Sequence, residues 1–193
     1  MRKVQMKHNL ANGLRLFFMP VKKFKTVSMG LFIHQELNDQ FAAKNALLTA
    51  VLEQGSRLYP DYLTLQRKLE ELYGAGLSTD IIKSGERHIL SFSLETAHSQ
   101  YLKEDNSYLE HSMAILGSLV GDPLVVNQAF NNDYVRQEKI QLIKDIKALL
   151  NDKSAYASER CTALMCAGER YGTYKLGKVE DYADIDSGAL FSY

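Results

Sequence analysis

Asn45-Ala46-Leu47-Leu48-Thr49-Ala50-Val51-Leu52-Glu53-Gln54-Gly55-Ser56 is the stretch that decides the fold of this 193-residue chain. Apolar residues recur at about every 3.6 positions from Ala43 to Val51, which predicts a helix over residues 41–54. Gly55 is predicted to cap the end of that helix, because glycine readily adopts the left-handed conformation found there. Two apolar, strand-like runs precede the helix, so the chain begins with a sheet and then packs a helix against it.

The segments around this helix predict an α+β fold with an antiparallel sheet. The predicted order is two strands, two helices, two strands and then further helices. Ser107 to Glu110 has the form of a capping box, which marks the start of one of these helices. Strands are predicted over residues 14–19, 26–33, 77–83 and 88–95, and helices over 41–54, 62–73, 107–120, 132–150 and 154–168, with a short helix near Tyr193.

Composition excludes several classes of function. The chain has 23 basic and 23 acidic residues, and a neutral chain without a basic stripe gives no electrostatic case for nucleic acid. No apolar run approaches about 20 residues, so no membrane span is expected. The N-terminus lacks the apolar core of a signal peptide. Cys161 and Cys166 lie on different faces of a predicted helix, so we expect free thiols and a cytoplasmic protein.

Taken in order, five segments resemble the insulinase-like (pitrilysin, M16) metallopeptidase family. That resemblance covers essentially the whole chain and implies one domain over residues 1–193. Its expected fold is that of a LuxS/MPP-like metallohydrolase, with helices packed on one side of an antiparallel sheet. Family domains continue into further strands, and a subunit holds two such domains. We therefore expect an N-terminal domain that is incomplete at its C-terminus. The five segments are residues 12–16, 26–33, 69–75, 138–146 and 171–177.

The resemblance also implies that the catalytic site is degenerate. In active members the helix before the Gly-Ser step carries His-x-x-Glu-His, and counting back from Gly55 places this motif on Ala46, Thr49 and Ala50. Alanine has no lone pair for zinc, and a threonine hydroxyl is no base near neutral pH. The third ligand falls on Asp145, whose side chain is shorter than the family's glutamate. We expect no catalytic residue, no bound metal and no cofactor, with both Ala46 and Ala50 pointing inward.

The other candidate residues have simpler interpretations. Glu138 and Asp145 are interpreted as solvated helix charges, and His88 as a surface residue or a hydrogen-bonded partner. The two cysteines are interpreted as small core or semi-buried residues. Tyr171 and Tyr174 lie in a glycine-bounded loop that resembles the substrate passage of active members. They are weak candidates for peptide binding, on the expectation that both are exposed.

Three functions remain open at this point. The first is a non-catalytic partner or peptide-chamber subunit, forming a homo-oligomer or a hetero-oligomer with an active family member. Peptide is its candidate ligand, and neither nucleic acid nor membrane is an expected partner. The second is a zinc-dependent or altered-chemistry peptidase whose site the sequence does not reveal. The third is a purely structural domain without a partner.

Overall fold

The computed structural model describes residues 6–10, 13–21, 23–102 and 107–193. Its main sheet is antiparallel and has the strand order β3-β5-β4. Strand β3 spans Thr26–Glu36, β4 spans Gly76–Ser84 and β5 spans Arg87–Ala97. The central strand β5 aligns Phe92 with Leu31 of β3 and Leu90 with Ile81 of β4. Apolar side chains of all three strands therefore meet on one face.

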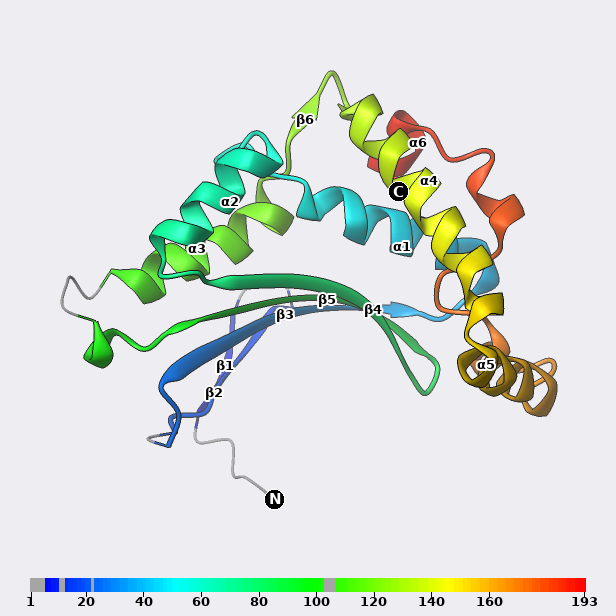
Figure 1. The fold of residues 1–193 in the computed structure, drawn as a ribbon, viewed down its shortest axis with the longest axis horizontal. Coiled ribbons are helices and arrows are strands. Elements are labelled where there is room, and N and C mark those ends of the chain that lie inside the picture. The colour runs from blue at the N-terminus through cyan, green and yellow to red at the C-terminus, as the bar shows by residue number, and fades with distance from the viewer. Residues whose placement is uncertain (1–5, 11–12, 22, 103–106) are drawn as a thin grey trace.

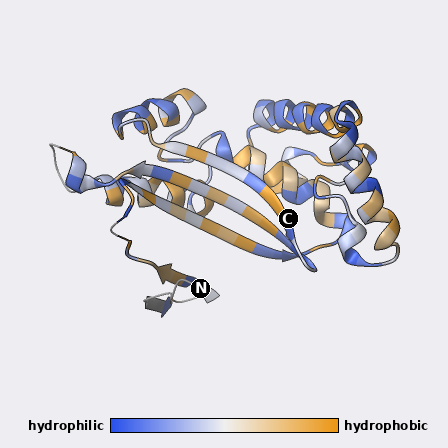
Figure 2. Ribbon diagram, turned by 60° about the horizontal axis from the view of Figure 1, so that its bottom comes forward, coloured by the Kyte–Doolittle hydropathy of each residue, from blue (hydrophilic) through white to orange (hydrophobic). Residues whose placement is uncertain are grey.

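Side chains alternate between the two faces of this sheet, as the two-residue period of a strand requires. Figure 1 shows helices α1, α2 and α3 on one side of the sheet. The opposite face carries exposed residues of β3, among them Ser28, Phe32 and His34. Figure 2 shows the resulting bands of hydrophobic and hydrophilic residues along the strands. The residues of β5 that face the helices are all buried: His88, Leu90, Phe92, Leu94 and Thr96.

Helix α1, Asp39–Glu53, lies at the centre of the core. Its N-cap is Asn38, whose side chain accepts a hydrogen bond from the Gln40 amide at 2.9 Å. Gln54 is the C-cap, and Gly55 follows with a positive φ of 157°. A Cβ at Gly55 would lie 2.6 Å from the Tyr59 carbonyl oxygen, closer than real side chains come. The predicted glycine at this helix end is thus required for both conformation and space.

The remaining elements frame this core. The hairpin of β1 (Met6–Asn9) and β2 (Arg15–Phe18) lies beside the open face of the sheet (Figure 1). A second small hairpin, β6 (Val125–Val126) with β7 (Ala129–Phe130), leads into the long helix α4. The helices outside α1 are α2 (Tyr62–Glu71), α3 (Tyr108–Gly121), α4 (Asn132–Ala148), α5 (Lys153–Met165) and α6 (Ser187–Phe191).

The structure confirms the predicted α+β class with helices on one side of an antiparallel sheet. The capping box at Ser107 is wrong, because within the described residues its side chain makes no cap hydrogen bond, although α3 begins at the next residue. Sequence reasoning also missed strands β1, β6 and β7. Of these, β6 and β7 have two residues each, which is too short to show an alternating pattern. Asn12, part of the first segment of the resemblance, lies outside the described residues. Among the described residues, no helix has the length and apolarity needed to cross a membrane.

Candidate functional site

The three motif positions lie on the buried side of α1. Ala46 is 2% exposed and Thr49 is 3% exposed, whereas Ala50 is half-buried. The prediction that both alanines point inward is confirmed for Ala46 and holds partly for Ala50. The Thr49 hydroxyl donates a hydrogen bond to the Asn45 carbonyl at 2.8 Å, within its own helix. This face of α1 therefore presents two methyl groups and a hydroxyl that is already engaged.

Helix α4 supplies the carboxylates beside α1. The Gln54 amide nitrogen donates to Glu138 Oε1 at 3.0 Å, which ties the end of α1 to α4. Burial raises the pKa of Glu138, and the negative charges of Glu53 and Asp145 raise it further. The interpretation of Glu138 as a solvated charge is wrong, because its side chain is half-buried. Asp145 is exposed as predicted, and it accepts a hydrogen bond from Gln141 at 2.8 Å.

Replacing Glu138 by glutamine is expected to stabilise the protein at neutral pH by less than about 1 kcal/mol, since the site is partly screened by solvent. Glutamine keeps an oxygen for Gln54 and removes the repulsion from Glu53 and Asp145. When folding raises the pKa of a carboxyl group, the protein loses stability as the pH rises from the unfolded pKa to the folded pKa. The gain should thus be complete above the folded pKa and vanish below about pH 4.3, where even the unfolded carboxyl is protonated.

Urea unfolding at several pH values measures this difference. Glu70→Gln, at an exposed position of α2, is the matched control and should show no such pH-dependent gain. A destabilised Glu138→Gln variant at neutral pH would contradict the repulsion argument.

The side chains present do not fit a catalytic zinc. An open zinc site needs three protein ligands, and the motif positions of α1 offer none. Within the described residues, no group of three or more histidine, cysteine, aspartate or glutamate side chains is placed to hold a metal ion. Cys161 and Cys166 are both free cysteines. Cys161 is exposed, so its interpretation as a core or semi-buried residue is wrong. Asp145 at the third-ligand position therefore has no partner ligands on α1.

The two tyrosine candidates differ in their surroundings. Tyr171 is 38% exposed, and the Lys83 ammonium lies 4.8 Å from the centre of its ring. Tyr174 is half-buried, so its expected exposure is wrong. Burial raises the pKa of Tyr174, and the charges of Glu159 and Asp145 add to that effect. Tyr174 is thus a partly buried residue that feels the charges of Glu159 on α5 and Asp145 on α4, and Tyr171 is the more exposed of the two tyrosines.

Both tyrosines belong to a segment that we call the strap, Arg170–Lys178. The strap crosses the ends of α1 and the sheet, and its contacts join residues far apart in sequence. Lys83 donates to the carbonyl of Thr173 at 3.0 Å, and Lys175 pairs with Asp80 at 3.1 Å. At its end, Gly177 packs directly on Ala43 of α1.

A buried polar network beneath the strap was missed by sequence reasoning. His88 is fully buried, and its two ring nitrogens each have a partner. Nδ1 lies 3.0 Å from the Asn45 amide nitrogen, and Nε2 lies 3.0 Å from the Lys175 carbonyl oxygen. The Tyr193 hydroxyl donates to Asn45 Oδ1 at 3.0 Å. The alternation of Leu90, Phe92 and Leu94 could have placed His88 on the buried face of its strand.

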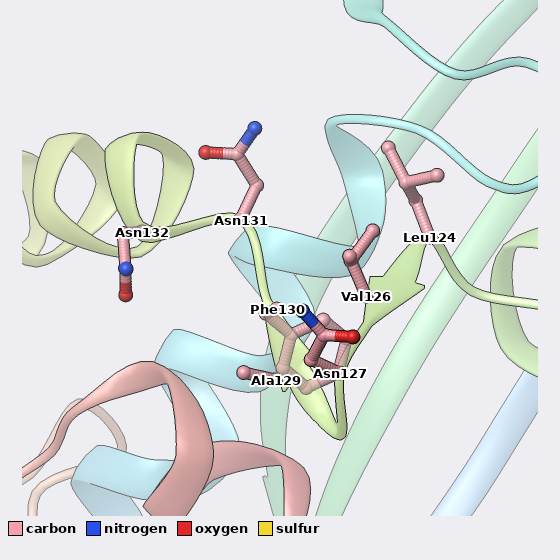
Figure 3. Close-up of a pocket in the computed structure, with 7 residues that line it drawn as sticks. All are labelled: Leu124, Val126, Asn127, Ala129, Phe130, Asn131 and Asn132. Carbon is pink, nitrogen blue, oxygen red and sulfur yellow. The ribbon is translucent and has the colours of Figure 1, made fainter.

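A separate hollow opens where β6, β7 and α4 meet. Its volume is about 370 Å³, and Figure 3 shows its lining side chains around the small hairpin. Asparagine amides and apolar groups make up the wall, and the motif positions of α1 do not contribute. The hollow is therefore distinct from the degenerate catalytic face. Its lining residues are Leu124, Val126, Asn127, Ala129, Phe130, Asn131 and Asn132.

No family model matches the chain. A curated relative does: the probable inactive metalloprotease YmfF of Bacillus subtilis (strain 168) is 36% identical over 179 residues, which is 93% of this chain. That similarity runs through the degenerate motif helix and the fold described above. The chain belongs to the insulinase-like (M16) family. It is a member that lacks the His-x-x-Glu-His side chains.

Solved structures agree on the insulinase-like fold. A conserved protein from Enterococcus faecalis V583 is 25% identical with a TM-score of 0.88, over 97% of this chain and 44% of that one. The inactive domain of an M16 peptidase from Pseudomonas fluorescens is 15% identical with a TM-score of 0.71, over 97% of this chain and 42% of that one. The chain likewise spans 42% of the length of the Bacillus relative, so it corresponds to less than half of each of these three proteins.

Proposed function

We propose that this chain is the N-terminal domain of a non-catalytic insulinase-like protein, which acts as a partner or peptide-chamber subunit beside an active zinc peptidase. A second, similar domain completes the full-length protein. The observation that carries this proposal is that α1 keeps the position of the motif helix but lacks its zinc-binding side chains. The helix keeps its place against the sheet and its Gly55 end, while Ala46, Thr49 and Ala50 stand at the motif positions. The scaffold is retained and the zinc ligands are absent from that helix.

The outer strands of the sheet support a role in binding. Within the described residues, β3 and β4 each pair only with β5 in the main sheet, so each has an outer edge. An extended peptide or another chain can add to such an edge through backbone hydrogen bonds. The β1–β2 hairpin adds exposed apolar side chains, which are typical of a surface that contacts another protein. These side chains include Leu14, Leu16, Phe17, Phe18 and Met19.

Co-purification of the full-length protein tests the partnership. The bait is the full-length chain, and the candidate prey is an insulinase-like protein of the same cell that retains His-x-x-Glu-His. A stoichiometric complex with more peptidase activity than the prey alone would support the proposal. A full-length protein that stays alone, with the active homologue present at high concentration, would contradict it. Peptide hydrolysis by the full-length protein alone would favour the altered-chemistry peptidase instead.

Metal analysis gives a second prediction for the chain itself. Because α1 supplies no ligand, purification without added zinc should yield well under one equivalent of zinc per chain. An active homologue with the intact motif, purified in parallel, is the control and should retain its metal. A stoichiometric zinc that is lost on replacing Asp145 by alanine would overturn the prediction.

A further inference from the structure

The buried His88 connects three parts of the fold that are distant in sequence. It lies on β5, with the Asn45 side chain of α1 at one ring nitrogen and the Lys175 carbonyl of the strap at the other, both at 3.0 Å. Its side chain is fully buried. It is therefore a single titratable group through which α1, the sheet and the strap are held together.

The partners of His88 define its protonation state. A carbonyl oxygen only accepts, so Nε2 must donate its hydrogen to the Lys175 carbonyl. The Tyr193 hydroxyl donates to Asn45 Oδ1, which leaves the Asn45 amide nitrogen as the donor to Nδ1. The imidazole is thus neutral with its proton on Nε2. A second proton on Nδ1 would face the amide hydrogens of Asn45.

The charges around His88 also disfavour a second proton. Lys83 lies directly opposite on β4, and Lys175 supplies the strap's own positive charge, while Gln35 of β3 is uncharged. Burial lowers the pKa of His88, the hydrogen bond to Lys175 acts against that effect, and the two lysines lower the pKa further. Glu159 and Asp80 accompany Lys83 and Lys175 as their ion-pair partners.

The strap also has anchors that do not involve His88. Its ion pairs are largely exposed, and exposed pairs contribute little. They join Arg170 to Glu36 and Glu86, Lys175 to Asp80, and Lys178 to Asp39. Lys83 holds the carbonyls of Tyr171 and Thr173 near the start of the strap. In the second half of the strap, two buried side chains hold backbone carbonyls: His88 bonds to that of Lys175, and the Tyr182 hydroxyl donates to that of Leu176 at 2.6 Å. Of these two side chains, only a histidine can titrate near neutral pH.

We propose that His88 is a proton-sensitive latch: opening of the strap lets water reach the enclosed neutral ring, which then takes up a proton, so that acid favours release of the strap. A protonated ring would keep its Nε2–H bond to the Lys175 carbonyl, and the contact that the second proton breaks is the one with Asn45 of α1. In the closed state the imidazole is neutral and bonded to both sides. In the opened state the ring is hydrated and can take up a proton at its ordinary pKa of about 6.5. Because the open form binds the extra proton, the free energy of opening falls as pH drops below about 6.5 and is constant above it. This inference does not depend on the proposed function.

Hydrogen exchange of the strap amides, corrected for the intrinsic pH dependence of exchange, tests the latch. One linked proton changes an equilibrium by at most tenfold per pH unit. Protection of residues 170–178 should therefore fall by up to about tenfold between about pH 7.5 and pH 5.5. Ordinary carboxylates titrate well below this range, at about pH 4, and contribute little to the change. Helix α3, which lies toward the other end of the sheet in Figure 1, serves as the internal reference and should keep its protection.

Two variants separate His88 from the other histidines. His88→Gln can donate to the Lys175 carbonyl and accept from Asn45, but it does not titrate, so its strap protection should be independent of pH. His34→Gln removes an exposed histidine on the open face of the same sheet and should behave like the natural protein. An equal loss of strap protection in His88→Gln would overturn the proposal.

If His88→Gln does not fold, nitrogen NMR of the natural protein decides the question. His88 should remain the Nε2–H tautomer at neutral pH, and its protonation should share a midpoint with the chemical-shift changes of the strap amides. Protonation of His88 without any change in the strap would overturn the latch.

Discussion

Replacing Gly177 by alanine is expected to lower the free energy of unfolding by about 3 kcal/mol, from overpacking and backbone strain together. Gly177 has a φ of +72°, a left-handed conformation that costs an alanine about 1 kcal/mol or more. An added Cβ would also lie 2.8 Å from the backbone nitrogen and 3.0 Å from the Cβ of Ala43. Ala43 is buried in the second turn of α1, so neither the strap nor the helix can move away cheaply.

Gly168→Ala is the matched control for this substitution. Gly168 also has a positive φ, +84°, but among the described residues no atom lies within 4 Å of the position of its Cβ. It therefore measures the backbone strain alone, and we expect a loss of about 1 kcal/mol. Urea unfolding of both variants gives the difference. Equal losses would show that the strap does not press on α1 as the structure describes.

Phe92→Ala is expected to have the largest effect, a loss of about 3–5 kcal/mol, which is the usual range for removing a buried phenylalanine. Phe92 is fully buried on the central strand, where it faces the helices between Leu31 of β3 and Thr79 of β4. Truncation removes apolar contacts and leaves a cavity that the surrounding sheet and α1 cannot fill. Thermal or urea unfolding measures the loss.

Phe32→Ala is the control for Phe92, because it is the same change on the neighbouring strand with the side chain on the opposite face. Phe32 is 54% exposed, so its truncation should cost about 1 kcal/mol or less. A similar loss for both variants would mean that the open face of the sheet is packed as tightly as the helical face. That result would contradict the one-sided arrangement in Figure 1.

These stability effects bear on the degenerate site. The inward positions of α1 carry small side chains, and Ala46 is buried. The substitution Ala46→His would overpack the same core that the Phe92→Ala and Gly177→Ala variants test. The motif helix of this insulinase-like chain has thus become part of the packing, with Glu138 and Asp145 left beside it on α4.

Sequence reasoning anticipated the local features of the site. It placed the motif helix, its glycine end and the inward direction of Ala46, because helical periodicity and glycine capping depend on neighbouring residues. It also placed Asp145 on the exposed side of α4. It failed at Glu138 and Tyr174, which are half-buried because α1, α4 and the strap converge on them. Burial of this kind comes from residues that are distant in the chain.

The sequence by itself determined the α+β order of elements, the loss of the zinc ligands and the need for glycine at position 55. The order of elements and the glycine follow from local spacing and turn chemistry. The missing zinc ligands follow from the resemblance to the insulinase-like family, which places its motif on side chains that cannot bind zinc. Only the tertiary structure decided that His88 joins Asn45 to the Lys175 carbonyl, and that Gly177 packs on Ala43. Those contacts span 43, 87 and 134 residues of chain, the last being the difference between positions 177 and 43. They exist because burying the apolar face of the sheet draws the strap over α1 and leaves the polar groups beneath it to satisfy one another.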